Sequence, residues 1–458
     1  MKNKTIKLGD IANVKNGYAY KSKDFIDNGV PIIKIKNISP PLVNLEDCNY
    51  VSEELYIQTL DYELVYGDIL ISMTGSGPNQ MSSAVGKVGR YRFNKKALQN
   101  QRVGKIEIID EKKYDKDFLY YYLSQKSMLD YFVNNSTGSA NQANISKKII
   151  ENAEVPNFSI EKQNKIKKIL DSLDKKIEVN NKIIANLEEQ AQAIFKSWFV
   201  DFEPFQDGNF VESELGMIPE RFKIVKLEDI YPLKSGYAFK SKDWTDRGFP
   251  IIKIKNINDG SIDFSDVDYV NNKNTLELAS KFRVYGTEIV MALTGATTGK
   301  FGVVPYKSDA YVNQRVGLFF DKLDIGNGFL YGLLKQKSII KNIIEMAQGS
   351  AQSNLSPRDV NNLKIIYCDK YKDIYKILNY FLEMVCKLLY QNKKLAEIRD
   401  ALLPKLMSGE IDVSNIKIKG EEVKNEWNLF RRWFWKNFYK IYWGLRLPLP
   451  PSPRTCKR

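Results

Sequence analysis

The chain has 458 residues, a length that suits two or three domains, and 43% of them are hydrophobic, enough for buried cores. It contains no histidine, which removes the commonest general base and the usual imidazole metal ligand. The formal net charge of +14 favours a polyanionic partner, but eight basic residues and no acidic one follow Trp427, so the preceding residues carry only +6.

The first 157 residues predict a mixed α/β domain. Its expected strands contain β-branched residues between glycine and proline, and its expected helix is rich in aromatic residues. The strands are predicted at Pro31–Lys36, Asp68–Met73 and Arg102–Ile109, and the helix at Asp117–Val133.

A long helix is predicted from Ser159 to Phe199, because this segment lacks glycine and proline. Its apolar residues recur at alternating steps of four and three, the spacing of a heptad seam, which contains one amide, Asn180. We assign residues 158–203 to this helix. The seam comprises Ile166, Leu170, Leu173, Ile177, Ile184, Leu187, Ala191, Ile194 and Trp198.

The first domain is duplicated over residues 204–368, which include the linker. GYAYKSKDF at Gly17–Phe25 recurs as GYAFKSKDW at Gly236–Trp244, 219 residues later. This repeat is far longer than that of a solenoid and indicates two copies of one domain. Further matches are PIIKIKNI (31–38 and 250–257), NQRVG (100–104 and 313–317) and the closing loops GSANQANIS (138–146) and GSAQSNLS (349–356).

A second long helix is predicted at residues 369–410, ending near Leu403-Pro404 and Gly409. Its seam comprises Ile377, Phe381, Met384, Leu388, Leu395, Ile398 and Leu402, with Gln391 at the position that matches Asn180. We expect the two helices to pair as an antiparallel coiled coil with these amides opposed, so that Ile177 faces Leu395 and Ile184 faces Leu388. The alternative is that each helix packs only on its own domain.

Several stretches resemble the specificity subunits of type I restriction–modification enzymes. They are EKQNKIKKILDSLDKKIEVN (161–180), AIFKSWFVDFEP (193–204), ELGMIPE (214–220), LLPKLMSGEI (402–411) and the GSAQSNLS loop. Together these motifs are specific, and the resemblance covers residues 1–412.

The resemblance implies a non-catalytic DNA-binding subunit with two target-recognition domains, separated and followed by long helices. Each domain would read one half of a split, asymmetric sequence in double-stranded DNA, and the helices would set the gap. The helices would also dock two methyltransferase subunits, which methylate adenine, and through them the restriction subunit, which translocates DNA. S-adenosylmethionine, ATP and magnesium would belong to these partners. Half-sites about one helical turn, ~34 Å, apart suit two readers held at a fixed distance.

Residues identical in both copies are candidates for contacts with the DNA backbone, because they cannot readily explain the reading of two different half-sites. The alternative is a solvated charged loop. Lys34 and Lys36 fall on one face of an expected strand, which favours an exposed sheet face. The backbone candidates are Lys21, Ser22, Lys23, Gln101 and Arg102, and their counterparts Lys240, Ser241, Lys242, Gln314 and Arg315.

Base contacts are expected where the copies diverge, at the turn that follows MTG or LTG and at the closing loop. Asparagine and glutamine can bond adenine edges bidentately. The alternative is that these loops are simply unconstrained. The candidates are Thr74, Ser76, Asn79, Gln80, Asn141 and Gln142 in the first copy, and Thr294, Thr297, Thr298, Gln352 and Ser353 in the second.

Other features argue against a catalytic or zinc-binding chain. The sequence contains neither the Asn/Asp-Pro-Pro-Tyr/Phe motif of an adenine methyltransferase nor the Pro-Asp that commonly opens a nuclease site, and its four cysteines form no CxxC. No apolar run approaches ~18 residues, so we expect a cytoplasmic protein with reduced thiols. A two-domain adaptor that binds proteins is the main alternative, and a stand-alone restriction enzyme is a weaker one.

The tail from residue 411 onward is basic, aromatic and proline-rich, unlike the rest of the chain. Aromatic residues among cations could stack on nucleic acid or lie on a membrane surface. We favour an accidental extension, such as out-of-frame readthrough.

Overall fold

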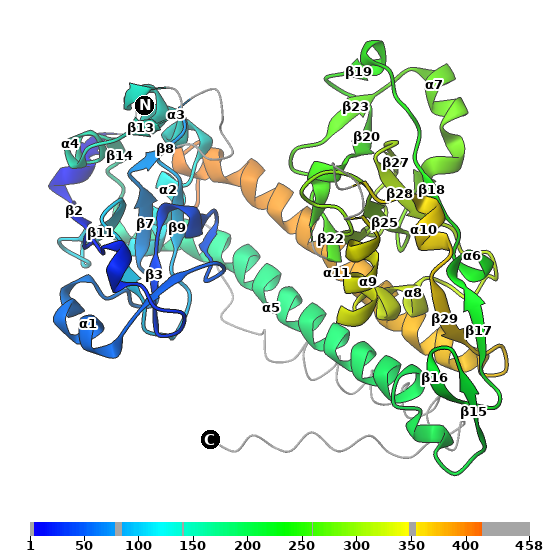
Figure 1. Ribbon diagram of the computed structural model, residues 1–458. Helices are drawn as coiled ribbons and strands as arrows, with labels where there is room; N and C mark the ends of the chain where they lie inside the picture. Colours follow the sequence, from blue (N-terminus) through cyan, green and yellow to red (C-terminus); the bar gives the residue numbers. More distant parts are fainter. Residues whose placement is uncertain (1–3, 78–84, 140–141, 259, 348–353, 415–458) are drawn as a thin grey trace. The chain divides into compact units, whose positions relative to one another are not determined.

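The computed structural model describes residues 4–77, 85–139, 142–258, 260–347 and 354–414 (Figure 1). These residues form two compact units, one from residues up to 175 together with those from 396 onward, and one from residues 176–395. Each unit therefore contains one copy of the duplicated domain and a segment of each long helix. The tail that follows residue 414 lies outside the described residues.

The duplicated domains have the same central sheet, six strands in the same order. In both sheets one internal pair is parallel and the others are antiparallel. The identical topology confirms the duplication. In the first unit the order is β2 (Ala12–Asn16), β11 (Val103–Ile108), β7 (Ile69–Ser72), β9 (Val88–Arg90), β5 (Leu42–Val43) and β4 (Ile38–Ser39). In the second it is β18 (Leu233–Ser235), β28 (Val316–Phe319), β25 (Ile289–Ala292), β26 (Phe301–Val303), β22 (Gly260–Ile262) and β21 (Ile257–Asn258).

Each domain also has a smaller sheet that contains the PII segment. Strands β3 (Val30–Ile33) and β20 (Phe249–Ile252) each lie between an antiparallel neighbour and a parallel one. The strand predicted at Pro31–Lys36 therefore ends early. Asn37 accepts a hydrogen bond from the Lys34 amide at 3.0 Å and is buried, and a 3₁₀ turn at Ile35–Asn37 replaces the strand end. Lys34 and Lys36 consequently do not share a strand face.

The helix predicted at Asp117–Val133 is broken into α2 (Lys116–Leu123) and α3 (Lys126–Asn134). Ser124 Oγ donates to the Tyr121 carbonyl at 2.9 Å and Gln125 Nε2 donates to the Tyr122 carbonyl at 3.0 Å. These side chains compete for carbonyls that a continuous helix would use, which explains the break. The second domain has the corresponding pair α8 (Gly328–Leu334) and α9 (Lys337–Ala347).

The two long helices are α5 (Ile160–Phe199) and α11 (Lys372–Met407) (Figure 1). Their segments run antiparallel in each unit. In the first unit Asp174 contacts Arg399, and Lys165 contacts Ser414, which follows the end of α11. In the second unit Asn180 contacts Gln391, and the Phe199 ring lies 5.9 Å from that of Tyr375. The antiparallel pairing is confirmed.

The predicted seam of the second helix is wrong at its end. Ile398 is 48% exposed, and the neighbouring Arg399 is turned inward, where its guanidinium binds Asp174. The helix also continues through Pro404 to Met407, and Leu403, Leu406 and Met407 are buried in the core of the first unit. Within the described ranges, no helix combines the length and the apolar character needed to cross a membrane.

Candidate nucleic-acid interface

The segments identical in both copies lie next to each other in the folded domain. In the first unit the Tyr18 amide donates to the Gln99 carbonyl at 3.0 Å, and the Gln101 amide donates to the Tyr18 carbonyl at 2.9 Å. In the second unit the Tyr237 amide donates to the Val312 carbonyl at 2.9 Å. The GYA segments that lead into the KSK loops are thus joined to the segments that carry the QR pairs in both domains, although the two are far apart in sequence.

A glycine permits this close approach in each domain. A Cβ atom on Gly17 would lie 2.3 Å from the Asn100 carbonyl oxygen, and one on Gly236 would lie 2.3 Å from that of Val312. Since neither carbonyl is the flexible end of a side chain, the GYA segment requires glycine at its first position.

The divergent loops adjoin the same residues. In the first domain the Met73 amide donates to the Arg102 carbonyl at 2.9 Å, and the Ile145 amide donates to the Met73 carbonyl at 3.0 Å. In the second domain the Leu293 amide donates to the Arg315 carbonyl at 3.0 Å, and the Leu355 amide donates to the Leu293 carbonyl at 2.8 Å.

We call this row of segments the recognition strip. In the first domain it contains residues 18–23, 99–102, 73–76 and 142–145, and in the second 237–242, 312–315, 293–298 and 354–355. The side chains of the ten backbone candidates, Lys21, Ser22, Lys23, Gln101, Arg102, Lys240, Ser241, Lys242, Gln314 and Arg315, are all exposed. The strip therefore carries cationic and amide donors beside loops that differ between the domains.

An aspartate side chain caps each KSK loop by accepting a hydrogen bond from a backbone amide. Asp24 accepts from the Lys21 amide at 2.7 Å, and Asp243 accepts from the Lys240 amide at 2.8 Å. Asp243 is 4% exposed and also accepts from the Thr275 hydroxyl at 3.1 Å. These carboxylates bind backbone amides, so the lysine side chains remain at the surface.

A shallow pocket of ≈ 290 Å³ lies at the edge of the second strip, lined by the strip residues Phe239, Asn313, Gln314 and Arg315 and by the neighbouring Trp244, Lys253 and Ile254. Lys253 Nζ lies 3.5 Å from the centroid of the Trp244 ring and 3.0 Å from Asp268. In the first domain Lys34 Nζ lies 4.2 Å from the Phe25 centroid and 2.7 Å from Asn49 Oδ1. Burial lowers the pKa of Lys34. These lysines are held by stacking, unlike the exposed KSK lysines.

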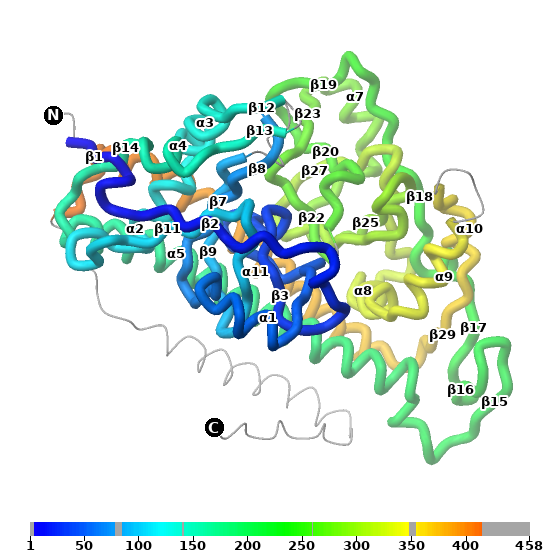
Figure 2. The backbone as a smooth tube through the Cα atoms, turned by 60° about the vertical axis from the view of Figure 1, so that its left-hand side comes forward, coloured from blue at the N-terminus to red at the C-terminus, as the bar shows by residue number. Residues whose placement is uncertain are grey.

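The divergent-loop candidates differ in accessibility. Thr74, in β8 (Thr74–Gly75), donates its hydroxyl to Asn144 Oδ1 at 2.9 Å, and Gln142 is exposed in β13 (Gln142–Asn144). Figure 2 shows β8 beside β13 and β12 (Thr137–Ser139), with which it forms one small sheet. Ser76 is only 8% exposed, so its side chain offers little surface for a contact with DNA.

In the second domain Thr294 and Thr297 are half-buried. The Thr298 hydroxyl donates a hydrogen bond within the turn, to the Gly295 carbonyl at 2.7 Å. Asn79, Gln80, Asn141, Gln352 and Ser353 lie outside the described residues.

Asn180 of α5 and Gln391 of α11 lie opposite each other, as expected from the two heptad seams. Asn180 is 1% exposed, and its Nδ2 donates to Gln391 Oε1 at 2.9 Å and to Asn392 Oδ1 at 2.8 Å. Asn392 in turn donates to Asn181 at 2.7 Å, so that four amides form a ladder. Their neighbours Ile177, Ile184, Leu388 and Leu395 are half-buried.

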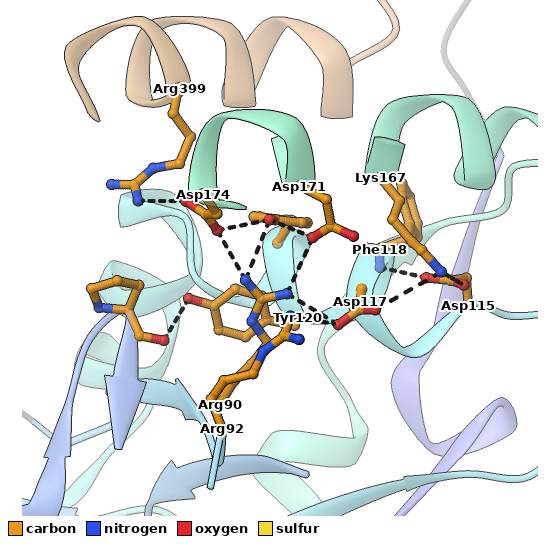
Figure 3. A network of polar contacts seen from close by, with 12 residues as sticks. Arg90, Arg92, Asp115, Asp117, Phe118, Tyr120, Lys167, Asp171, Asp174 and Arg399 are labelled. Atoms are coloured by element: carbon orange, nitrogen blue, oxygen red, sulfur yellow. Dashed lines mark hydrogen bonds and ion pairs between the residues drawn. The ribbon is translucent and has the colours of Figure 1, made fainter. Parts of the chain in front are cut away.

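A buried ionic cluster docks the first domain on the helices (Figure 3). The Arg90 side chain is 2% exposed, and its guanidinium lies 3.0 Å from Asp117, 3.4 Å from Asp171 and 2.9 Å from Asp174. The Tyr121 hydroxyl lies 2.8 Å from an Asp171 oxygen and 2.7 Å from an Asp174 oxygen, so the two carboxylates share its one proton. Burial disfavours the charged guanidinium, but the surrounding tyrosines and aspartates hold the pKa of Arg90 above its ordinary value.

The second domain docks through an apolar layer at the equivalent positions. Arg90 pairs with Ile69 across β9 and β7, and Val303 pairs with Ile289 across β26 and β25. Leu382 and Val385 stand in α11 where α5 has Asp171 and Asp174, and both are 2% exposed. Sequence reasoning missed this difference, although an arginine in the apolar strand Val88–Arg90 was a visible sign of it.

Comparison with known proteins identifies the family. The model of the type I restriction modification DNA specificity domain matches residues 1–189 and 219–399. The chain is 26% identical to the Type I restriction enzyme MjaVIII specificity subunit of Methanocaldococcus jannaschii, over 79% of this chain and 83% of the relative. It is also 26% identical to the HindI specificity subunit of Haemophilus influenzae, over 89% and 99%.

The fold agrees with a solved structure. The crystal structure of the type I restriction–modification S subunit from M. genitalium matches with a TM-score of 0.52 and 18% identity, covering 90% of this chain and 96% of that one. The chain therefore shares the fold of that S subunit. This chain belongs to the type I restriction–modification DNA specificity family.

Proposed function

We propose that the chain is the specificity subunit of a type I restriction–modification complex and binds a bipartite, asymmetric target in double-stranded DNA. Each domain reads one half-site, and the paired helices set the gap. Partner methyltransferase and restriction subunits carry out adenine methylation and cleavage, with S-adenosylmethionine, ATP and magnesium bound to them.

The observation that carries this proposal is the recognition strip, present in both domains. Its exposed lysines, arginine and glutamine are identical in the two copies and suit contacts with phosphates, which fix position without reading sequence. The adjoining turns and closing loops differ between copies and suit contacts with base edges. One row of residues therefore combines a shared anchor with a variable reader.

The test removes the anchor from one domain at a time in the full-length chain, assembled with its methyltransferase subunit. Lys21→Gln/Lys23→Gln/Arg102→Gln and the matched Lys240→Gln/Lys242→Gln/Arg315→Gln should each weaken binding to all DNA sequences. Each lost phosphate contact should flatten the slope of log K against log salt by about 0.9. Lys112→Gln is the control, since this exposed lysine follows the opposite end of β11.

The target itself is found by mapping methylated adenines across a genome with and without the chain. A split, asymmetric motif that depends on the chain supports the proposal. Gln142→Ala should relax one position of one half-site and leave the salt slope unchanged, because a base contact carries specificity. Unchanged binding in both anchor variants would reject the strip as the interface, and a stable complex without DNA specificity would favour the adaptor alternative.

A further inference from the structure

The two long helices carry opposite charges at equivalent positions. Asn180 and Gln391, which bond to each other, stand 211 residues apart. The same spacing separates Glu188 in α5 from Arg399 in α11. We call the first domain with α5 the first repeat, and the second domain with α11 the second repeat. Glu188 and Arg399 are thus the same position in two repeats, with the charge reversed.

Each of these charges meets its complement in the other repeat. In the first unit Arg399 Nη1 lies 2.9 Å from Asp174 Oδ1, with side chains 16% and 17% exposed. In the second unit the Glu188 carboxylate accepts from the Tyr331 hydroxyl and lies 3.7 Å from Lys335 Nζ, with the ionic side chains 27% and 24% exposed. All four ionic groups are largely shielded from solvent, so their attraction is screened less than at an open surface.

Pairing between like repeats of two chains would reverse both contacts. If α5 paired with α5 of a second copy in the same register, Glu188 would take the place of Arg399 and face Asp174. If α11 paired with α11, Arg399 would take the place of Glu188 and face Lys335. Each of these pairs would contain two repulsive contacts, so a dimer that formed both would replace four attractive contacts, two in each chain, by four repulsive ones.

We propose that Glu188 and Arg399 select pairing between unlike repeats and thereby exclude a second copy of the chain. The amide ladder cannot make this selection, because Asn180 opposite another Asn180 would still form amide hydrogen bonds. The amides fix the register of the helices, and the charges choose the partner. This inference concerns assembly and holds whether or not the chain binds DNA. With the proposed function, it ensures that the two domains held on one helix pair are one of each kind.

The test exchanges the two charges in the full-length chain, as Glu188→Arg/Arg399→Glu. In this variant intrachain pairing is repulsive at both contacts, and pairing of like repeats between chains is attractive at both. Two differently tagged copies are co-expressed and purified through one tag, and the share of the other tag and the mass in solution are measured. The control is Lys168→Glu/Glu189→Lys, which exchanges charges at two exposed positions of α5.

Wild type and control should be monomers, whereas the exchanged variant should form mixed dimers whose share rises with concentration. Its mixed fraction should exceed that of the wild type by more than about tenfold, since each contact changes from attraction to repulsion. A folded exchanged variant that stays as monomeric as the control overturns the proposal, as does a wild type that already mixes freely.

A milder variant decides the question if the exchanged variant is recovered only as aggregate. Glu188→Gln/Arg399→Gln removes the selection without introducing repulsion, and it should raise the mixed fraction above that of the control. Arg399→Lys keeps the charge and should behave as wild type. A neutral variant that mixes no more than the wild type overturns the proposal.

Discussion

Replacing Arg90 by valine, the residue that occupies this position in the second domain, should destabilise the first unit by about 3–5 kcal/mol. The Arg90 side chain is 2% exposed and compensates the buried carboxylates of Asp171 and Asp174, which are 15% and 17% exposed. Asp174 keeps Arg399 as a partner. The loss therefore comes mainly from Asp171, which retains the Tyr121 hydroxyl and the more distant charge of Lys167 but no ion pair in this cluster.

Two variants separate this cause from simple loss of packing. Arg92→Val removes an arginine that is 22% exposed and lies 3.4 Å from Asp117, and it should cost less than about 1 kcal/mol. Arg90→Val/Asp171→Leu recreates two positions of the apolar layer of the second domain. It should recover at least about 2 kcal/mol of the loss, since replacing both partners removes the unpaired charge.

The assay must report on the first unit. Trp198 and Trp244 both lie in the second unit, and residues 1–175 contain no tryptophan, so tryptophan fluorescence is unsuitable. Hydrogen exchange of peptides from β9 and α2, followed through urea unfolding of the full-length chain, measures the required free energy. The reasoning is refuted if Arg90→Val costs no more than Arg92→Val, or if the double variant is no more stable than the single one.

Three further predictions concern the helix ladder, the strip and alkaline pH. Asn180→Ala should lower the free energy of unfolding by about 1–2 kcal/mol, because Gln391 Oε1 and Asn392 Oδ1 both lose their donor. The exposed Asn181→Ala should cost less than about 0.5 kcal/mol, as measured in urea. Gly17→Ala should cost at least about 2 kcal/mol, since its Cβ would lie 2.3 Å from a backbone oxygen. Gly208→Ala, whose Cβ would lie 3.2 Å from the nearest atom, should cost clearly less, and equal thermal shifts of the two variants would contradict this. Burial raises the pKa of Tyr91 to about 12, so the folded state holds this proton more tightly than the unfolded state. The free energy of unfolding should therefore fall as the pH rises between about pH 10 and 12. Tyr91→Phe should show a shallower fall across this window, and an unchanged slope would exclude Tyr91 as its cause.

The duplication, the two long helices and the antiparallel pairing could be predicted because they depend on patterns local in sequence. Identical stretches align without knowledge of the fold, and the alternation of apolar residues defines a helix face. The pairing of Asn180 with Gln391 followed from aligning the two seams at their amides. The identical KSK and QR segments could be named from the sequence, but their adjacency could not, since backbone bonds such as Gln101 to Tyr18 join residues far apart in the chain.

The docking of the domains on the helices depends on such distant contacts. Ile398 is apolar and fits the heptad, yet Arg399 takes the inward position because the facing helix α5 presents Asp174, which also contacts Arg90 and Tyr121 of the first domain. A helix pattern records which faces are apolar, but it does not record the charge of the surface that packs against them. Side chains from three segments must converge before a buried arginine becomes favourable. The repeat can therefore be predicted from the sequence alone. The difference between its two docking layers, one ionic and one apolar, arises only when each domain packs on the helices.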